Sequence, residues 1–445
     1  MKIFPLLLTA QLSVALLACG QKEKGNQASD ATNTQLPATP DLPAPGKSEK
    51  RFSNVIGWPD GKVPTAPTGF VVTEFARDLV NPRWIYVAPN SDVLVAESNT
   101  EKKGTKKAVA VVTGQAKSQR FDESANRITL FRDTNNDGKP DLKKVFVSGL
   151  NQPFGMLIQG NYFYVANTDG LMRFPYQPDA TSISGPGTKI KELPAGGYNN
   201  HWTRTILASP DGKKLYVSVG SGSNVGENGM EHEVKRAAIW EMNPDGSGER
   251  LYATGLRNPV GLAWYPGTAD NDKPTLYTAV NERDELGDEL VPDYLTSVKE
   301  GGFYGWPYAY YNQIEDPRRK GERPDLVKKT IAPDVALGAH TASLGLAFYQ
   351  KPTGKVATAF PGKYTNGAFI GQHGSWNRSK FSGYKVVFVP FAGGKPTGTP
   401  EDFLTGFIAN DNDVYGRPVG VTMLPDGSML VADDAGNRIW RVAAK

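Results

Sequence analysis

His201 has the surroundings best suited to proton transfer among the four histidines of the chain. It ends the loop of residues 196–201 (GGYNNH), just before a predicted strand. An imidazole titrates near neutral pH, so it can accept a proton from a substrate hydroxyl. For a single histidine, a structural hydrogen-bonding role is the simpler alternative. His201 is therefore a candidate catalytic base, and His340 and His373, each close to a glycine, are candidates for lining a pocket.

Two further motifs carry groups that bind anions or cations. In residues 255–261 (GLRNPVG), Arg257 and Asn258 stand beside a rigid proline, a pairing that suits carboxylate or quinone oxygens; a solvated turn is the alternative. Residues 281–289 (NERDELGDE) hold five carboxylates within eight residues. Carboxylates this close repel one another unless a cation or arginines compensate, and oxygen-rich loops suit calcium. An aromatic turn, residues 301–307 (GGFYGWP), follows and is suited to lining a pocket.

A separate loop, residues 133–141 (DTNNDGKPD), has the spacing of a calcium-binding loop. Oxygen-bearing side chains stand at positions 1, 3, 5 and 9, and glycine at position 6 permits a sharp turn: Asp133, Asn135, Asp137 and Asp141. The glutamate typical of position 12 is replaced by Lys144. The loop predicts a structural calcium site away from the catalytic centre, with a plain hairpin turn as the alternative.

The elements that position these residues are short strands preceded by turns. The chain has 48 glycines and 33 prolines, and a turn followed by an alternating strand recurs six times, at residues 93–97, 162–167, 215–220, 276–281, 368–373 and 429–433. Several of these strands precede another one, as at residues 127–131, 238–242 and 438–442. Such units bury their sheet faces against one another around an axis. We therefore predict an all-β, six-bladed β-propeller rather than a β-sandwich, with function where loops converge on the central channel.

The first residues resemble an export signal with a lipid-attachment site. Met1 and Lys2 precede an apolar run, and residues 16–19 (LLAC) have the form of a lipobox ending at Cys19, the only cysteine. An ordinary cleaved signal is the alternative. We predict a signal peptide at residues 1–18, a lipidated flexible linker at 19–50 and the propeller at 51–445. The protein is then periplasmic and membrane-anchored, and Gly20 after Cys19 favours the outer membrane.

The charge balance argues against nucleic acid as a partner. The chain has 50 basic and 46 acidic residues and no basic cluster interleaved with aromatic residues. With one cysteine there is no disulfide within the chain, so the hydrophobic core must hold the fold.

The motifs occur in an order that resembles a known family. His201 stands nine residues before a Pro-Asp-Gly turn, and the Arg-Asn-Pro-x-Gly, Gly-Asp-Glu and Gly-Gly-x-Tyr-Gly-Trp-Pro motifs follow it. From about Gly69 to Lys445 the sequence resembles the soluble quinoprotein glucose and L-sorbosone dehydrogenases. Residues 373–378 (HGSWNR) and 81–84 (NPRW) resemble the sorbosone-type branch.

This resemblance implies a six-bladed propeller that binds pyrroloquinoline quinone (PQQ) and calcium over its central channel. By the resemblance, His201 is the base that removes the hydroxyl proton at C1 of the sugar. Arg257, Asn258 and Arg417 contact cofactor oxygens, and Arg204 and Arg378 are added as candidate cofactor contacts.

Three departures from the glucose-type pattern concern the cofactor and its calcium. Arg283-Asp284 replaces a Gly-Pro pair that supplies two backbone carbonyls to calcium, so those carbonyls, with Asp284 or Asp288, are the candidate ligands. Val419 stands where a second arginine is expected, and Arg378 is a candidate to replace a lysine of the family.

The resulting expectation is a dehydrogenase that oxidises an aldose or sugar aldehyde to a lactone or acid and passes electrons to a cytochrome or a membrane quinone. PQQ does the hydride chemistry, while the protein supplies the base and compensates charge. The alternatives are a calcium-dependent lactonase and a lipoprotein propeller that binds a glycan or a protein without cofactor.

Overall fold

The computed structural model describes residues 41–101, 105–118, 124–135, 137–267, 274–354 and 356–445. The predicted signal peptide, Cys19 and the linker up to residue 40 lie outside the described residues, as does Asn136 of the predicted calcium loop.

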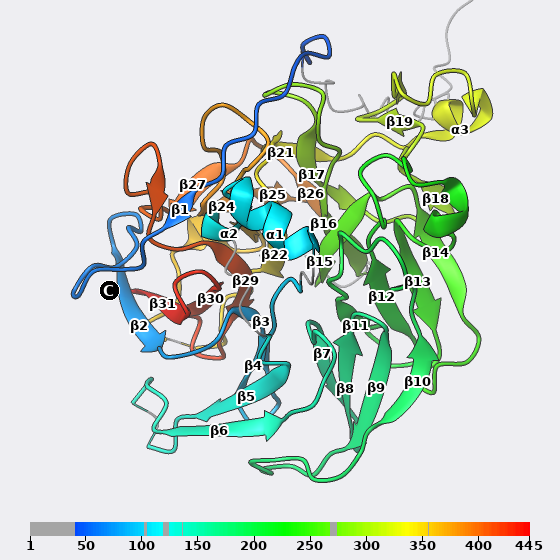
Figure 1. Ribbon diagram of the computed structural model, residues 1–445. Helices are drawn as coiled ribbons and strands as arrows, with labels where there is room; N and C mark the ends of the chain where they lie inside the picture. The colour runs from blue at the N-terminus through cyan, green and yellow to red at the C-terminus, as the bar shows by residue number, and fades with distance from the viewer. Residues whose placement is uncertain (1–40, 102–104, 119–123, 136, 268–273, 355) are drawn as a thin grey trace, which may run out of the picture. The chain divides into compact units, whose positions relative to one another are not determined.

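Six sheets, each with four antiparallel strands, surround a central axis (Figure 1). From the axis outward, the first four sheets are β3 (Pro82–Val87), β4 (Val93–Glu97), β5 (Arg127–Arg132) and β6 (Leu142–Val147); β7 (Met156–Gln159), β8 (Tyr162–Asn167), β9 (Gly170–Pro175) and β10 (Thr188–Glu192); β11 (Ile206–Ala208), β12 (Leu215–Val219), β13 (Ala238–Met242) and β14 (Arg250–Thr254), extended by β18 (Gly302–Phe303); and β15 (Asn258–Tyr265), β16 (Thr275–Asn281), β17 (Pro292–Ser297) and β21 (Val335–Ala339). The last two are β22 (Ser343–Phe348), β23 (Ala368–Gln372), β24 (Lys385–Val389) and β27 (Glu401–Leu404); and β29 (Pro418–Met423), β30 (Met429–Asp433), β31 (Arg438–Ala444) and β2 (Phe70–Ala76).

The ring closes because the last sheet combines both ends of the propeller sequence. Strand β2 comes before the first blade in sequence but pairs antiparallel with β31, from Phe70 opposite Ala444 to Ala76 opposite Ile439. Strand β2 is thus the fourth strand of the last blade, and the chain segment that follows it leads into the first blade, which joins the two ends of the ring. The prediction of a six-bladed β-propeller is confirmed.

The six repeated strands of the sequence are the second strand of each blade, counted from the axis. They are β4, β8, β12, β16, β23 and β30, and nearly every residue in them is buried. A strand in this position has a neighbouring blade on each face, so both faces carry apolar side chains. This double burial explains why these strands are the clearest signals in the sequence.

Glycines allow the innermost strands of adjacent blades to approach closely. A Cβ atom on Gly345 of β22 would lie 2.3 Å from the Val419 carbonyl oxygen of β29. No side chain fits at that distance, so these blades contact each other through backbone near the axis. Side-chain packing between them lies farther out.

Short elements decorate the faces of the ring. Helices α1 (Thr105–Val112) and α2 (Gln115–Ser118) are inserted between β4 and β5, and Figure 1 shows them near the axis. Helix α3 (Pro324–Lys329) and the hairpin of β19 (Ala309–Tyr310) and β20 (Ile314–Glu315) lie between β18 and β21 in sequence. Smaller pieces are the 3₁₀ turns Met230–Glu233 and Gly362–Tyr364, and the strands β1 (Asn54–Val55), β25 (Phe391–Ala392), β26 (Lys395–Pro396) and β28 (Asp413–Val414).

The folded part begins a few residues earlier than the sequence analysis places it. The Gly46 N–H donates to the Leu286 carbonyl at 2.8 Å, and the Ser48 hydroxyl oxygen accepts from the Gly287 N–H at 2.8 Å. Residues 46–50, assigned above to the linker, therefore lie against the propeller. In the described ranges no helix is long and apolar enough to cross a membrane.

Candidate functional site

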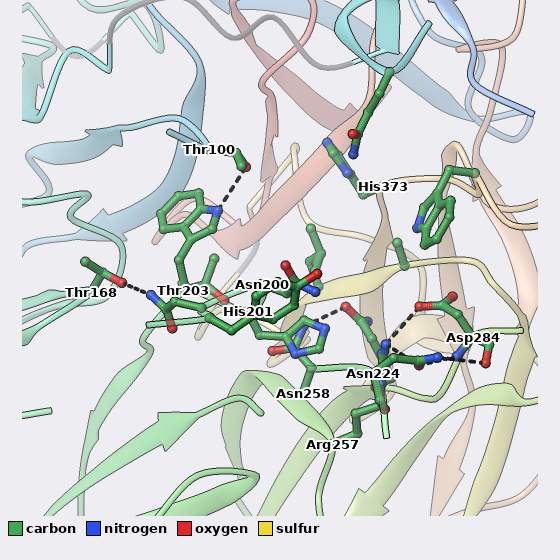
Figure 2. A pocket seen from close by; sticks show the side chains of 18 of the residues that line it. Thr100, Thr168, Asn200, His201, Thr203, Asn224, Arg257, Asn258, Asp284 and His373 are labelled. Atoms are coloured by element: carbon green, nitrogen blue, oxygen red, sulfur yellow. Dashed lines mark hydrogen bonds and ion pairs between the residues drawn. The ribbon is translucent and has the colours of Figure 1, made fainter. Parts of the chain in front are cut away.

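A cavity of about 1480 Å³ lies on the propeller axis and receives residues from all six blades. Its lining includes Arg83, Thr168, His201, Arg257, His373 and Arg417. These residues lie near the start of an innermost strand or the end of a second strand. Because paired strands run antiparallel, both positions lie at the same face of the propeller. The predicted convergence of loops on the channel is thus what brings the side chains together (Figure 2).

His201 reaches the cavity with one ring nitrogen held by the protein. Its Nδ1 lies 2.9 Å from the Ser221 carbonyl oxygen and 3.0 Å from the Ser221 hydroxyl, which itself donates to the Ser223 carbonyl. A carbonyl only accepts, so Nδ1 carries the hydrogen and Nε2 keeps its lone pair. Burial, followed by the nearby Arg257 charge, lowers the pKa of His201 to about 3. The imidazole is therefore neutral near pH 7.

The backbone next to His201 has no room for a side chain. A Cβ on Gly220 would lie 2.5 Å from both His201 Cβ and Asn258 Oδ1. Glycine at this position, directly after β12, lets the loop that carries His201 pack onto the strand that carries Asn258. The two predicted site residues are thereby neighbours in the cavity wall.

Arg257 is fixed by a dense set of acceptors. Its guanidinium donates to Asp284 Oδ2 at 2.8 Å, to Asn224 Oδ1 at 3.0 Å and to the Glu282 carbonyl at 2.6 Å (Figure 2). The Asp284 N–H also donates to Asn224 Oδ1 at 2.9 Å. Despite burial, the Arg257 charge and the hydrogen bond from His340 hold the pKa of Asp284 down at about 2. The pair is a buried, ionised salt bridge in the cavity wall.

Two oxygens near this pair have no donor. Asn258 Oδ1 and Glu282 Oε2 are buried and have no hydrogen-bond partner among the described residues, although both residues line the cavity. Burial raises the pKa of Glu282 to about 8. Buried polar atoms normally have a partner, so these two mark a place for a cation or a ligand donor.

Arg417 enters the cavity from the start of the last blade, two blades along the ring from Arg257. Its guanidinium donates to the carbonyls of His373 at 2.9 Å, Gly374 at 2.9 Å and Ser118 at 3.1 Å, and to the Ser118 hydroxyl at 3.0 Å. All four acceptors are neutral, so the guanidinium keeps its charge available to an anion. Ser118 is the last residue of α2, so the helical insertion helps to hold this arginine.

A second buried ion pair joins Arg83 to Asp434, and His373 contacts the same carboxylate. Arg83 lies 2.9 Å from the Asp434 carboxylate, and His373 Nε2 lies 2.9 Å from the same group. Burial and Arg417 lower the pKa of His373 to about 4, so this histidine is neutral too. Arg83 and Asp434 come from the first and last blades, so nothing in the sequence alone signals that they form a pair.

Four predicted site residues have side chains held outside this cavity lining. Arg204 is fully buried behind the His201 loop and donates to the carbonyls of His201 and Pro194, each at 2.7 Å. Arg283 is buried in an ion pair with Asp316. Arg378 is paired with Glu289 at 2.5 Å, and Asp288 lines a smaller cavity where it accepts from the Ser379 N–H at 3.0 Å.

The backbone carbonyls predicted for calcium already accept hydrogen bonds. The Arg283 carbonyl accepts from the Val291 N–H at 3.4 Å, and the Asp284 carbonyl accepts from Asn224 Nδ2 at 3.1 Å. The Asp284 carbonyl also accepts from the Arg283 guanidinium, so only the Arg283 carbonyl keeps a second lone pair, while Asp284 lines the cavity with its side chain. Of the predicted set, Asp284 is thus the side chain best placed for a cation.

The loop of residues 133–141 is a compact turn closed by its own carboxylates. Asp133 accepts from the backbone N–H groups of Asp137 and Gly138, and Asp141 accepts from the Thr134 N–H and hydroxyl. Asn135 Oδ1 also accepts from the Asp137 N–H at 2.9 Å. Within the described ranges, no three or more histidine, cysteine, aspartate or glutamate side chains are grouped to hold a metal ion.

The fold and the site together define a β-propeller with an arginine-lined cavity on its axis and a neutral histidine inside it. The chain belongs to the TrAA12-like family, which matches residues 64–445.

Sequence relatives extend over about two thirds of the chain. An uncharacterized protein from Borreliella burgdorferi is 33% identical over 304 residues, 66% of this chain and 76% of that protein. A pyrroloquinoline quinone-dependent pyranose dehydrogenase from Coprinopsis cinerea is 25% identical over 338 residues, 63% of this chain and 44% of that enzyme. The chain thus spans less than half of the length of the fungal enzyme.

Solved structures share the fold at low sequence identity. The holo PQQ domain of the Coprinopsis cinerea pyranose dehydrogenase has a TM-score of 0.66 at 20% identity and covers 88% of this chain and 100% of its own. A calcium structure of the Trichoderma reesei family AA12 protein has a TM-score of 0.67 at 18% identity and covers 86% of this chain and 97% of its own. The PQQ-bound aldose sugar dehydrogenase from Streptomyces coelicolor has a TM-score of 0.54 at 18% identity, covering 86% of this chain and 100% of its own.

The residues of the cavity fit an anionic, oxygen-rich cofactor with a cation. Among the described residues, the Arg417 guanidinium donates only to neutral acceptors. Arg257 and its neighbour Asn258 also line the cavity. Asn258 Oδ1 and Glu282 Oε2 are oxygens that lack a donor among the described residues. A cofactor carboxylate would complement the arginine charge, and a calcium ion would complement the two oxygens that lack a donor.

Proposed function

We propose that this protein is a PQQ-dependent sugar dehydrogenase that oxidises an aldose or a sugar aldehyde to a lactone or an acid. The observation that carries the proposal is His201, a neutral imidazole in the axial cavity whose Nδ1 is bonded to Ser221 and whose Nε2 has no hydrogen-bond partner among the described residues. The named relatives, a pyranose dehydrogenase and an aldose sugar dehydrogenase, support this class of substrate.

The chain's own residues divide the work of binding and proton transfer. His201 Nε2 accepts the proton of the sugar hydroxyl at C1, and the hydrogen bonds to Ser221 hold the ring in the tautomer that this step requires. Arg417, Arg257 and Asn258 would hold the cofactor through its oxygens, and the Arg257 charge would stabilise negative charge there. When bound, PQQ supplies the two-electron acceptor for the hydride.

Calcium is proposed to bind beside Arg257, where oxygen ligands are gathered. Asp284 is ionised and lines the cavity, and the two oxygens of Asn258 and Glu282 described above lack donors among the described residues. Hard cations such as calcium prefer carboxylate and amide oxygens of this kind. Asp288 and the side chain of Arg283 lie outside this group.

The location and the electron acceptor are proposed from the sequence. A lipid on Cys19 would anchor the protein at the periplasmic side of a membrane, with the outer membrane favoured by Gly20. Electrons from the cofactor would then pass to a periplasmic cytochrome or a membrane quinone.

A titration of the full-length protein with PQQ and calcium, followed by sugars and a dye acceptor, tests the proposed function. Stoichiometric cofactor binding with sugar-dependent dye reduction is the expected result. Hydrolysis of lactones without a cofactor would instead identify a lactonase. Binding of neither cofactor nor calcium would contradict the proposal and favour a propeller that binds a glycan or a protein partner.

A further inference from the structure

Residues 46–53, here called the strap, form part of the cavity although they precede the family-matched region at residue 64. Besides the bonds of Gly46 and Ser48, the Arg51 N–H donates to the Trp376 carbonyl at 2.9 Å, and Asn377 Nδ2 donates to the Glu49 carbonyl at 3.2 Å. The Arg51 guanidinium donates to the Ser379 carbonyl at 2.8 Å. The strap is thus anchored by backbone and polar contacts to residues 286–287 and 376–379.

The side chains that the strap presents to the cavity are Lys50 and Phe52. The Phe52 ring stacks on the Trp376 ring, with centroids 5.9 Å apart and planes 4° apart, and both residues are half-buried. The Lys50 ammonium lies 5.9 Å from the Trp376 ring centre and 3.9 Å from the Glu285 carboxylate. The cavity wall therefore combines two parallel aromatic rings with a cation and an anion.

Anchoring the strap does not by itself explain the two rings. The hydrogen bonds of Gly46, Ser48, Glu49 and Arg51 already hold the segment. An aromatic pair that remains half-exposed at the wall of a hydrated cavity leaves apolar surface in contact with water. A ligand with a flat apolar face would cover that surface and be stabilised by it.

A pyranose ring has the matching chemistry, because one face carries C–H groups while its edge carries hydroxyls. We infer that Phe52 and Trp376 form a subsite for a pyranose ring, with Lys50 and Glu285 facing its hydroxyl groups. This inference rests on the proposed function, and it assigns sugar specificity partly to a segment outside the family-matched region. The proton-accepting His201 lies in the same cavity.

The test uses the full-length chain and compares four variants with the wild type. Phe52→Ala and Trp376→Ala remove a ring, and Phe52→Tyr retains it. Ile56→Ala is the matched control, since Ile56 is an exposed apolar residue of the same N-terminal region and does not line the cavity. Three quantities are measured: calorimetric sugar affinity of the cofactor-free protein, PQQ affinity, and KM and kcat with a dye acceptor.

Removing either ring is expected to weaken sugar binding and raise KM by about threefold to tenfold, the size of one aromatic contact. PQQ affinity and kcat should change by less than about twofold. Phe52→Tyr should bind sugar more tightly than Phe52→Ala because it keeps the ring, and Ile56→Ala should match the wild type. Unchanged sugar affinity in both alanine variants overturns the inference. So does an equal loss of PQQ affinity, which would assign the rings to the cofactor. A wild type that binds sugar but not PQQ would refute the proposed function alone, and the calorimetric comparison would still decide the subsite.

Discussion

Asp284 accepts hydrogen bonds from two groups that are far apart in sequence, Arg257 Nη2 at 2.8 Å and His340 Nδ1 at 3.3 Å. The carboxylate compensates the arginine charge and raises the pKa of His340, although burial of the imidazole opposes that rise. The cavity thus contains one histidine biased toward the charged form, His340, and two held neutral, His201 and His373. Contact with Asp284 favours the charged form of His340, whereas burial and a nearby arginine, Arg257 or Arg417, keep the other two neutral.

Replacing Asp284 with asparagine should destabilise the fold. The change leaves Arg257 buried without its carboxylate, and breaking a buried pair costs roughly 3–5 kcal/mol. Urea unfolding followed by circular dichroism measures the loss. The control is Asp325→Asn, which breaks an exposed pair with Arg323 and should have no measurable effect. Equal stability of the two variants would contradict the structural role of the Arg257–Asp284 pair.

Loss of the His201 imidazole should abolish most turnover while cofactor binding persists. For His201→Ala we expect kcat to fall on the order of 10²–10⁴-fold, the usual contribution of a general base. His232→Ala is the matched control, since that histidine is exposed and does not line the cavity. Because the His201 pKa is about 3, the wild-type kcat/KM should show no loss from this group between pH 7 and pH 5. A fall in wild-type kcat/KM below about pH 6.5 that is absent in His201→Ala would contradict the low pKa of His201.

His373 should make the fold sensitive to acid. Its pKa is lowered from 6.5 to about 4 in the folded protein, so the unfolded chain takes up the proton first as the pH falls. The folded state therefore loses stability from about pH 6.5 downward, by roughly 2 kcal/mol at pH 5 from this residue. In His373→Gln, which retains a donor for Asp434, the difference in unfolding free energy between pH 7 and pH 5 should shrink. If the pH dependence of the variant equals that of the wild type, His373 does not supply it.

Arg417 and Arg204 should respond differently to the same substitution by lysine. Lysine cannot reproduce the planar fork that reaches several acceptors at once. Arg417 lines the cavity, so Arg417→Lys should weaken PQQ binding by about tenfold or more, the value of one charge-assisted contact. Arg204 is fully buried behind the His201 loop, so Arg204→Lys should chiefly lower the melting temperature. A larger effect of Arg204→Lys than of Arg417→Lys on PQQ affinity would reverse this assignment.

The loop of residues 133–141 has a direct metal test. If it binds calcium, Asp137→Asn should remove one calcium equivalent, measured by calorimetry, and abolish calcium-dependent thermal stabilisation from this site. PQQ-dependent activity should be unchanged, because the loop residues do not line the axial cavity. Equal calcium stoichiometry in the wild type and the variant would show that the loop is a plain turn, held by the Asp133 and Asp141 hydrogen bonds.

The sequence by itself determined the blade pattern and part of the site. The second strand of each blade is buried on both faces, so its apolar run and preceding turn are visible without tertiary information. His201, Arg257 and Arg417 all lie in loops that precede an innermost strand. Their grouping around one cofactor was predicted from the resemblance to the quinoprotein dehydrogenases, and all three line the same cavity.

Only the tertiary structure decided where the other side chains point. Arg204 and Arg378 carry the charge expected of cofactor ligands, but each is held by another partner: the backbone carbonyls of the His201 loop for Arg204, and Glu289 for Arg378. Lys50 belongs to the segment whose composition predicts a linker, yet it reaches the cavity because the strap binds residues 376–379. The physical reason is the same in each case. A side chain adopts the direction that satisfies its charge or buries its ring, and the groups that do so come from distant parts of the sequence.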